Sequence, residues 1–77
     1  MQVITIGKNE YTAERTEHGE FLLWSPLGTG YTIFNGMKPL DPSKRYYAHS
    51  LTGGRMTYRG NPRLFTVDEE GNLILAN

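Results

Sequence analysis

The sequence contains no cysteine, and this absence excludes disulfide scaffolds, thiolate metal sites and cysteine nucleophiles. It also has no excess of charge, because eight Lys and Arg balance eight Asp and Glu among its 77 residues. A chain of this length forms a single small domain over residues 1–77. We expect its free energy of unfolding to be roughly 4 to 12 kcal/mol.

Long hydrophobic runs are missing as well. The longest uncharged stretch, residues 21–37, has 17 residues and is interrupted by a proline and three glycines. A helix that spans a membrane needs about 18 or more apolar residues. The N-terminus has no basic segment of the kind that opens a signal peptide. We therefore expect a complete, cytoplasmic gene product with no membrane segment.

Glycine and proline divide what remains into pieces of strand length. Such pieces are shorter than the 10 to 12 or so residues of a stable helix, and these are rich in β-branched and aromatic residues. The sequence predicts a mainly β domain, an antiparallel barrel or sandwich of about six strands with one short helix. Strands are expected near residues 2–6, 11–16, 21–24, 31–35, 56–59, 64–67 and 73–76.

The most clearly marked hairpin joins residues 64–67 to residues 73–76. A type I turn at Glu69 and Glu70, followed by a left-handed Gly71, would place Val67 opposite Leu73. This register predicts a core face made of four apolar side chains, namely Phe65, Val67, Leu73 and Leu75.

A second hairpin is expected through a two-residue loop at His18 and Gly19. This loop would place Ala13 opposite Trp24. The strand at residues 21–24 is apolar at every position, which predicts an inner strand covered on both faces.

One segment favours a helix. Asp41 is suited to an N-cap and Pro42 to the first helical position, and Tyr47, Ala48 and Leu51 then form one stripe. We predict a short helix near residues 42–50, with a strand as the alternative because tyrosines also suit a sheet.

The sequence contains few residues that could form a catalytic site or a metal site. His18 and His49 are the only histidines, and they stand 31 residues apart with no metal-ligand spacing. Ser50 adjoins His49, but neighbouring side chains on a strand point to opposite faces. We expect no enzymatic activity, no metal and no cofactor.

The zero net charge hides a pattern along the chain. Residues 1–20 carry two net negative charges, residues 21–37 none, residues 38–63 five net positive charges and residues 64–77 three negative ones. Tyrosines lie among the cations of the basic segment, and arginine with tyrosine is typical of binding surfaces. The candidate binding residues are Lys44, Arg45, Tyr46, Arg55, Arg59 and Arg63.

Three interpretations of this segment remain open. It could bind an acidic surface of a partner protein, or bind single-stranded nucleic acid by stacking bases on its tyrosines. It could also pair with the acidic ends of its own chain. Dedicated nucleic-acid domains usually have a pI above about 9. The sequence pI is about 6.7, which favours a protein partner.

A small chain with a polarised charge pattern and no site motif is similar in kind to phage-encoded inhibitors of host defence. The resemblance implies an inhibitor or adaptor that acts by occupying a surface of its partner. An exposed edge strand would also allow two copies to form a homodimer.

Overall fold

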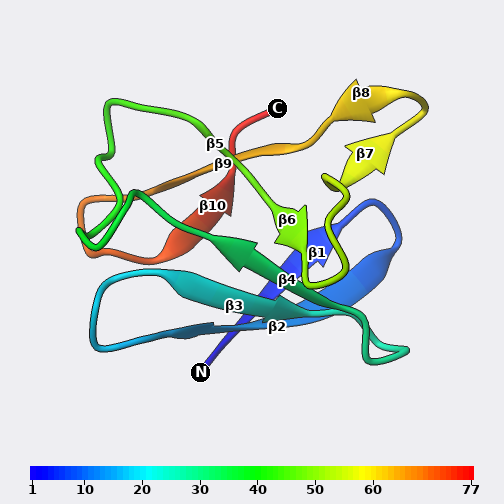
Figure 1. The fold of residues 1–77 in the computed structure, drawn as a ribbon, viewed down its shortest axis with the longest axis horizontal. Helices are drawn as coiled ribbons and strands as arrows, with labels where there is room; N and C mark the ends of the chain where they lie inside the picture. The colour runs from blue at the N-terminus through cyan, green and yellow to red at the C-terminus, as the bar shows by residue number, and fades with distance from the viewer.

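Ten short strands and no helix make up the computed structural model, which describes residues 1–77 (Figure 1). In chain order they are β1 (Gln2–Ile6), β2 (Asn9–Arg15), β3 (Phe21–Trp24), β4 (Gly30–Ile33), β5 (Tyr46–Tyr47), β6 (His49–Ser50), β7 (Thr57–Tyr58), β8 (Asn61–Pro62), β9 (Leu64–Val67) and β10 (Leu73–Leu75). The mainly β, antiparallel prediction is confirmed, although the chain forms ten short strands instead of about six. Nothing helical in the structure is long or apolar enough to cross a membrane.

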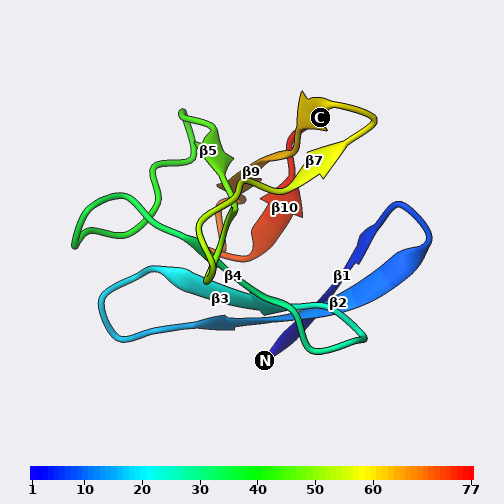
Figure 2. The same cartoon turned by 45° about the vertical axis from the view of Figure 1, so that its right-hand side comes forward.

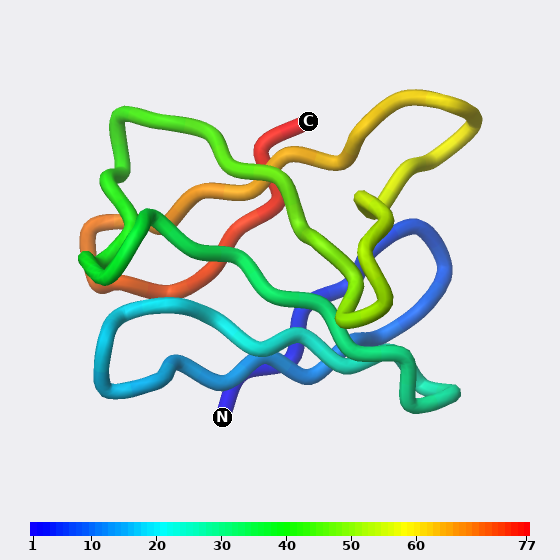
Figure 3. Tube along the Cα trace, in the orientation of Figure 1, coloured from blue at the N-terminus to red at the C-terminus, as the bar shows by residue number.

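The strands form three antiparallel sheets. The largest has the order β1-β2-β3-β4-β6, the second has the order β10-β9-β5, and β7 pairs only with β8. Figure 2 shows the first sheet as one layer and the strands β5, β9 and β10 as a second layer above it. The β7–β8 hairpin projects from these layers at one end of the molecule (Figure 3).

The core lies between the two layers. Alternate residues of each strand face it, because side chains along a strand point to opposite sides in turn. Phe65, Leu23 and Ile33 are fully buried there, and Ala48 is buried where the chain passes from β5 in one sheet to β6 in the other. The buried apolar residues are Ile4, Ile6, Ala13, Phe21, Leu23, Ile33, Leu40, Ala48, Met56, Phe65, Val67 and Leu73.

The arrangement is not a closed barrel, because the edge strands β1 and β10 do not pair through their backbones. A side chain spans the gap instead. The Gln2 amide Nε2 donates to the Leu73 carbonyl at 2.6 Å, and its Oε1 accepts from the Leu73 N–H at 2.9 Å. The amide thus satisfies both backbone groups of one residue at the open edge of the second sheet.

The hydrogen bonds between Gln2 and Leu73 predict that a substitution at Gln2 lowers the free energy of unfolding. Gln2→Glu removes the donor and sets a carboxylate against the Leu73 carbonyl, so the free energy of unfolding should fall by about 1–3 kcal/mol. Urea unfolding measures the change. Asn9→Asp makes the same chemical change at an exposed residue, and it should leave stability nearly unaltered. Equal losses in both variants would show that the bridge does not stabilise the fold.

The C-terminal hairpin has the predicted register. Val67 pairs with Leu73 and Phe65 with Leu75, and Gly71 has a positive φ of 83°. The predicted core face is confirmed.

The first hairpin differs from its prediction by one residue. Ala13 pairs with Leu23 rather than with Trp24. The loop has three residues, because the Thr16 N–H donates to the Glu20 carbonyl at 2.8 Å and Gly19 takes the left-handed conformation with φ of 88°. The shift brings Leu23 and Phe21 to the core and turns Trp24 to the opposite face.

The strand β3 is an inner strand, as predicted, but only one of its faces is covered. Phe21 and Leu23 are buried, whereas Trp24 is 36% exposed on the side away from the second layer.

The helix predicted near residues 42–50 is absent. The Lys44 N–H donates to the Asp41 carbonyl at 3.0 Å, so the segment makes one turn and then enters β5 and β6. An Asp followed by a Pro favours a type I turn as much as a helix start. Pairing of Tyr46 with Phe65 extends the chain beyond that turn.

A similar correction applies to the strand predicted at residues 56–59. A regular strand would have placed Tyr58 with Met56 in the core, but Met56 is buried and Tyr58 is 50% exposed. The Met56 N–H donates to the Ala48 carbonyl at 2.8 Å, and the chain then leaves the core layers as the separate β7–β8 hairpin.

Candidate functional site

The six candidate binding residues do not form one patch. Lys44 and Arg45 lie exposed in the turn that follows Asp41, while Arg59 and Arg63 belong to the β7–β8 hairpin and the residue after it. These segments lie toward opposite ends of the molecule (Figure 3). Sequence proximity had grouped residues that the fold separates.

Two other candidates have contacts within the fold. The Tyr46 hydroxyl accepts a hydrogen bond from the Asp41 N–H at 2.9 Å, and its ring packs against the core. The Arg55 guanidinium lies 4.4 Å from the centre of the Tyr47 ring. Tyr46 therefore stabilises the turn, whereas Arg55 is an exposed cation held on an aromatic face.

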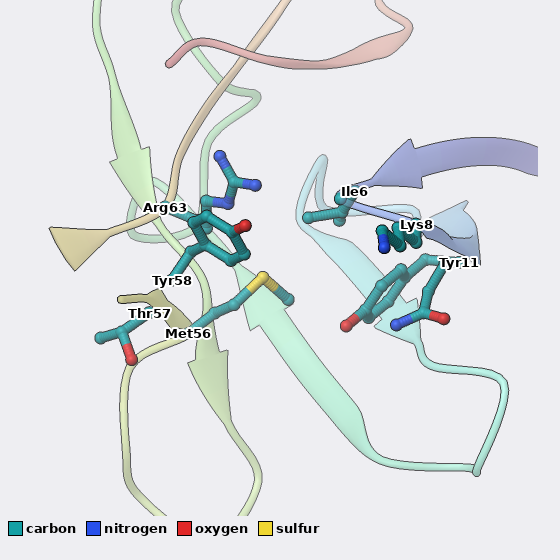
Figure 4. Close-up of a pocket in the computed structure, with 9 residues that line it drawn as sticks. Ile6, Lys8, Tyr11, Met56, Thr57, Tyr58 and Arg63 are labelled. Carbon is teal, nitrogen blue, oxygen red and sulfur yellow. The ribbon is translucent and has the colours of Figure 1, made fainter. Parts of the chain in front are cut away.

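Arg63 lines a groove of about 300 Å³ between the β7–β8 hairpin and the β1–β2 turn, and Arg59 lies beside this groove on the ring of Tyr58. Figure 4 shows Met56, Tyr58 and Arg63 on one wall and Lys8 and Tyr11 on the other. The groove is lined by Ile6, Gly7, Lys8, Asn9, Tyr11, Met56, Thr57, Tyr58 and Arg63. None of these residues is acidic, so the groove offers hydrogen-bond donors and positive charge.

Tyr58 holds both arginines at the rim. The guanidinium of Arg63 lies 4.7 Å from the ring centre, and that of Arg59 lies 5.3 Å from it. Stacking restricts each guanidinium, and the N–H groups in the guanidinium plane that remain exposed can donate to an anion.

Arg59 occupies an unfavourable backbone position. It is the only residue other than glycine with a positive φ, at 53°, and Gly60 follows with φ of 82°. Tyr58 pairs with Asn61, so Arg59 and Gly60 form a two-residue hairpin loop of the type that favours Asn-Gly. An arginine at this tip adds no evident stability, and strained positions of this sort cluster at functional sites.

The guanidinium of Arg63 is partly buried but makes few hydrogen bonds. Its Nε is buried without a hydrogen-bond partner, and its Nη1 reaches only the Asn77 carbonyl at 3.5 Å. A guanidinium stays charged at any physiological pH, so a partly buried one gains from an anion beside it.

Tyr11 adds a donor on the facing wall. Burial raises the pKa of its hydroxyl, the neighbouring Tyr31 raises it further, and Arg63 lowers it to a lesser degree. The rings of Tyr11 and Tyr31 are 6.5 Å apart. Because its pKa is raised above 10, the Tyr11 hydroxyl stays protonated at neutral pH and can donate to an anion.

The cations of the groove do not pair with the acidic ends of the chain. No Lys or Arg nitrogen lies within 4.0 Å of an Asp or Glu carboxylate oxygen, and the one contact between an imidazole and a carboxylate is His18 Nε2 to Glu17 Oε1 at 3.7 Å. The positive charges of the groove are therefore not neutralised by salt bridges to Asp or Glu of the same chain.

The charges also separate along the longest axis, which measures 27 Å. In Figure 3 the turns at residues 16–20 and 68–72 and the loop at residues 34–45 lie at the left, and the segments at residues 7–8 and 51–63 lie at the right. The left segments carry six acidic and three basic residues, whereas the right segments carry four basic residues, with the acidic Glu10 following residues 7–8 in β2. One end of the molecule is thus positive and the other negative.

Lys8 and Tyr11 were not among the candidates from the sequence. Lys8 belongs to the net acidic segment of residues 1–20 and comes to the groove only because the β1–β2 turn lies opposite the β7–β8 hairpin. No local pattern of the sequence reveals this approach.

The two histidines have ordinary surroundings. His49 lies 5.8 Å from Phe34 and 6.3 Å from Tyr47, measured between ring centres. The neighbouring Ser50 hydroxyl is hydrogen-bonded to Thr52 at 3.0 Å instead of to His49. His18 stands beside Glu17 in an exposed turn.

Comparison of the chain with protein-family models, curated proteins and solved structures finds no match. The surface and its charges are therefore the basis for inferring function.

Proposed function

We propose that this protein acts without chemistry, by binding an acidic surface of a partner protein through the groove between the β1–β2 turn and the β7–β8 hairpin. The observation that carries the proposal is the pair of arginines stacked on Tyr58, with no Asp or Glu partner in their own chain. Arginine and tyrosine at the centre of an interface contribute much of its binding energy. A carboxylate of the partner would fit between Arg63 and Lys8.

The protein would act by occupying a surface of its partner. A domain of 77 residues that covers an acidic site on another protein would act as an inhibitor or an adaptor. The similarity in kind to phage-encoded inhibitors of host defence is consistent with this proposal.

Single-stranded nucleic acid is the second candidate, and the separation of charge favours it. The acidic turns lie away from the groove, so they would not repel a phosphate backbone bound there. The groove and its rim, however, offer only Lys8, Arg59 and Arg63 as cations. Because so few phosphate contacts release few counterions and give weak binding, we favour the protein partner.

Affinity capture from the source cell, with three immobilised baits, tests the proposal. Arg63→Glu should reduce retention of the partner at least tenfold relative to the wild type, because like charges at an interface cost several kcal/mol. Arg45→Glu makes the same charge change in the distant turn and should retain the partner as the wild type does.

Equal retention by all three baits would contradict the groove as the binding site, and loss with Arg45→Glu alone would move the site to the other end. A labelled single-stranded oligonucleotide, mixed with micromolar protein at about 50 mM salt, tests the second candidate. A shift that weakens with salt and with Arg63→Glu would favour nucleic acid over the protein partner.

A further inference from the structure

The outer face of the five-stranded sheet is uncovered. The second layer packs on the opposite face, and below the strands β2 and β3 Figure 2 shows only the N-terminal end of the chain and the β3–β4 loop. Apolar side chains that the core does not use project from this outer face. The exposed fractions are 61% for Val3, 36% for Trp24, 46% for Phe34 and 59% for Leu51.

Two of these side chains cover Gly30, where β3 ends and β4 begins. A Cβ atom at Gly30 would lie 2.7 Å from Cζ3 of Trp24 and 2.8 Å from Cδ1 of Leu51, so both side chains fold over this glycine. They form an apolar pair on the outer face at this end of β4. Contiguous exposed apolar surface of this kind marks interaction sites.

A row of paired residues crosses the same face. Glu14 pairs with Leu22, Leu22 with Thr32, Thr32 with His49, and His49 with Arg55. Directly paired residues of an antiparallel sheet point to the same side, so all five side chains share the outer face. The row has a carboxylate at one end, a guanidinium at the other and Thr32 at its centre.

This row is complementary to itself. A two-fold axis along β4, through the position of Thr32, exchanges the ends of the row. When a second copy is laid face to face about that axis, Glu14 lies opposite Arg55 of the other copy, and Arg55 lies opposite its Glu14. The same axis sets Trp24 opposite Leu51. Neither Glu14 nor Arg55 has an ion-pair partner within its own chain.

We propose that two copies of this chain form a symmetric dimer through the outer face of the sheet β1-β2-β3-β4-β6. A two-fold interface uses the same patch on both copies, which is what the reciprocal pairs of Glu14 and Arg55 provide. The dimer uses neither Arg59 nor Arg63 and leaves the groove open, so it is independent of the proposed function.

The size of the outer face determines the expected affinity of the dimer. The five strands lie about 4.8 Å apart and range from two to seven residues in length, which gives a face of about 24 Å by about 15 Å. This is about 360 Å² per copy, less than half of the roughly 800 Å² per partner of a standard interface, so we expect a weak, reversible dimer that forms at about 100 μM or above.

Sedimentation equilibrium between about 1 and 500 μM tests for the dimer, which should appear as a concentration-dependent rise in mass from 8.7 kDa toward twice that value. Trp24 is the single tryptophan, and its emission should shift to shorter wavelength over the same concentration range as it becomes buried. A monomer at every concentration would overturn the proposal.

Charge reversal tests the geometry. Glu14→Arg and Arg55→Glu should each raise the dissociation constant of the dimer at least tenfold, since either change places like charges opposite each other at both ends of the row. An equimolar mixture of the two variants should recover a heterodimer, because the reversed charges then complement each other. Each variant is checked for its β-sheet circular dichroism.

The matched controls are Glu69→Arg and Arg45→Glu, which make the same charge changes in turns away from the face. Alone they should leave the dimer intact. A dimer that survives Glu14→Arg and Arg55→Glu, or a mixture that does not recover association, would overturn the proposed face. Pairing through an edge strand would then be the geometry to test.

Discussion

Replacing Phe65 with alanine should lower the free energy of unfolding by about 3–5 kcal/mol. Phe65 has no exposed surface, and it lies in β9 between Tyr46 of β5 and Leu75 of β10. Its ring fills the space between the two layers, and a small domain has no second core to offset the cavity. Against an expected stability of roughly 4 to 12 kcal/mol, this loss is large enough to populate the unfolded chain at room temperature.

Urea unfolding followed by far-UV circular dichroism measures this loss. Ile74→Ala is the matched control, because Ile74 belongs to the same hairpin but is 40% exposed. It should cost less than about 1.5 kcal/mol, since little apolar surface is lost. Similar losses in the two variants would mean that the core does not lie between these layers.

Gly19→Ala should have the next largest effect, a loss of about 2–5 kcal/mol. Two costs combine at this position. The residue has φ of 88°, a conformation that a Cβ atom disfavours. The added Cβ would also lie 2.6 Å from Cα of Pro39, a backbone atom that cannot rotate away. The first hairpin and the loop before β5 would both have to move.

Gly7→Ala separates these costs. Gly7 has φ of 63°, and a Cβ atom added there would meet nothing within 4 Å, so its substitution carries the backbone cost alone, about 1–2 kcal/mol. Thermal unfolding of both variants gives the difference. If Gly7→Ala destabilised the fold as much as Gly19→Ala, contact with Pro39 would not constrain the hairpin.

The two hairpins show how far local sequence determines register. Both have three-residue loops that end in a left-handed glycine, Gly71 in one and Gly19 in the other. The acidic pair before Gly71 made the longer loop evident, whereas His18 and Gly19 also fitted a two-residue loop. Since a shift of one residue turns every side chain to the other face, this choice decided where Trp24 lies.

The segment after Asp41 shows a different limit. Its first residues suit a turn and a helix start equally, and the outcome depends on pairing with β9, which follows some 20 residues later. The open outer face was equally hidden, because an apolar strand does not indicate how many layers cover it. The groove depends on Lys8 and Arg63, which only the folded chain brings together.

Three of the arginines without an Asp or Glu partner lie on two surfaces, the groove with its rim and the outer face of the sheet. Arg59 and Arg63 serve the proposed partner, and Arg55 serves the proposed dimer. A dimer would present two grooves at once, which would strengthen binding to a partner that carries two acidic sites.

Binding of the captured partner to Arg59→Asn, measured by calorimetry, tests the central claim most directly. Asparagine suits the left-handed position before Gly60 better than arginine does, so the variant should be at least as stable as the wild type. It should nevertheless bind the partner at least tenfold more weakly, while Arg45→Asn should bind as the wild type does. An unchanged dissociation constant for Arg59→Asn would contradict the claim that the arginines on Tyr58 form the binding site.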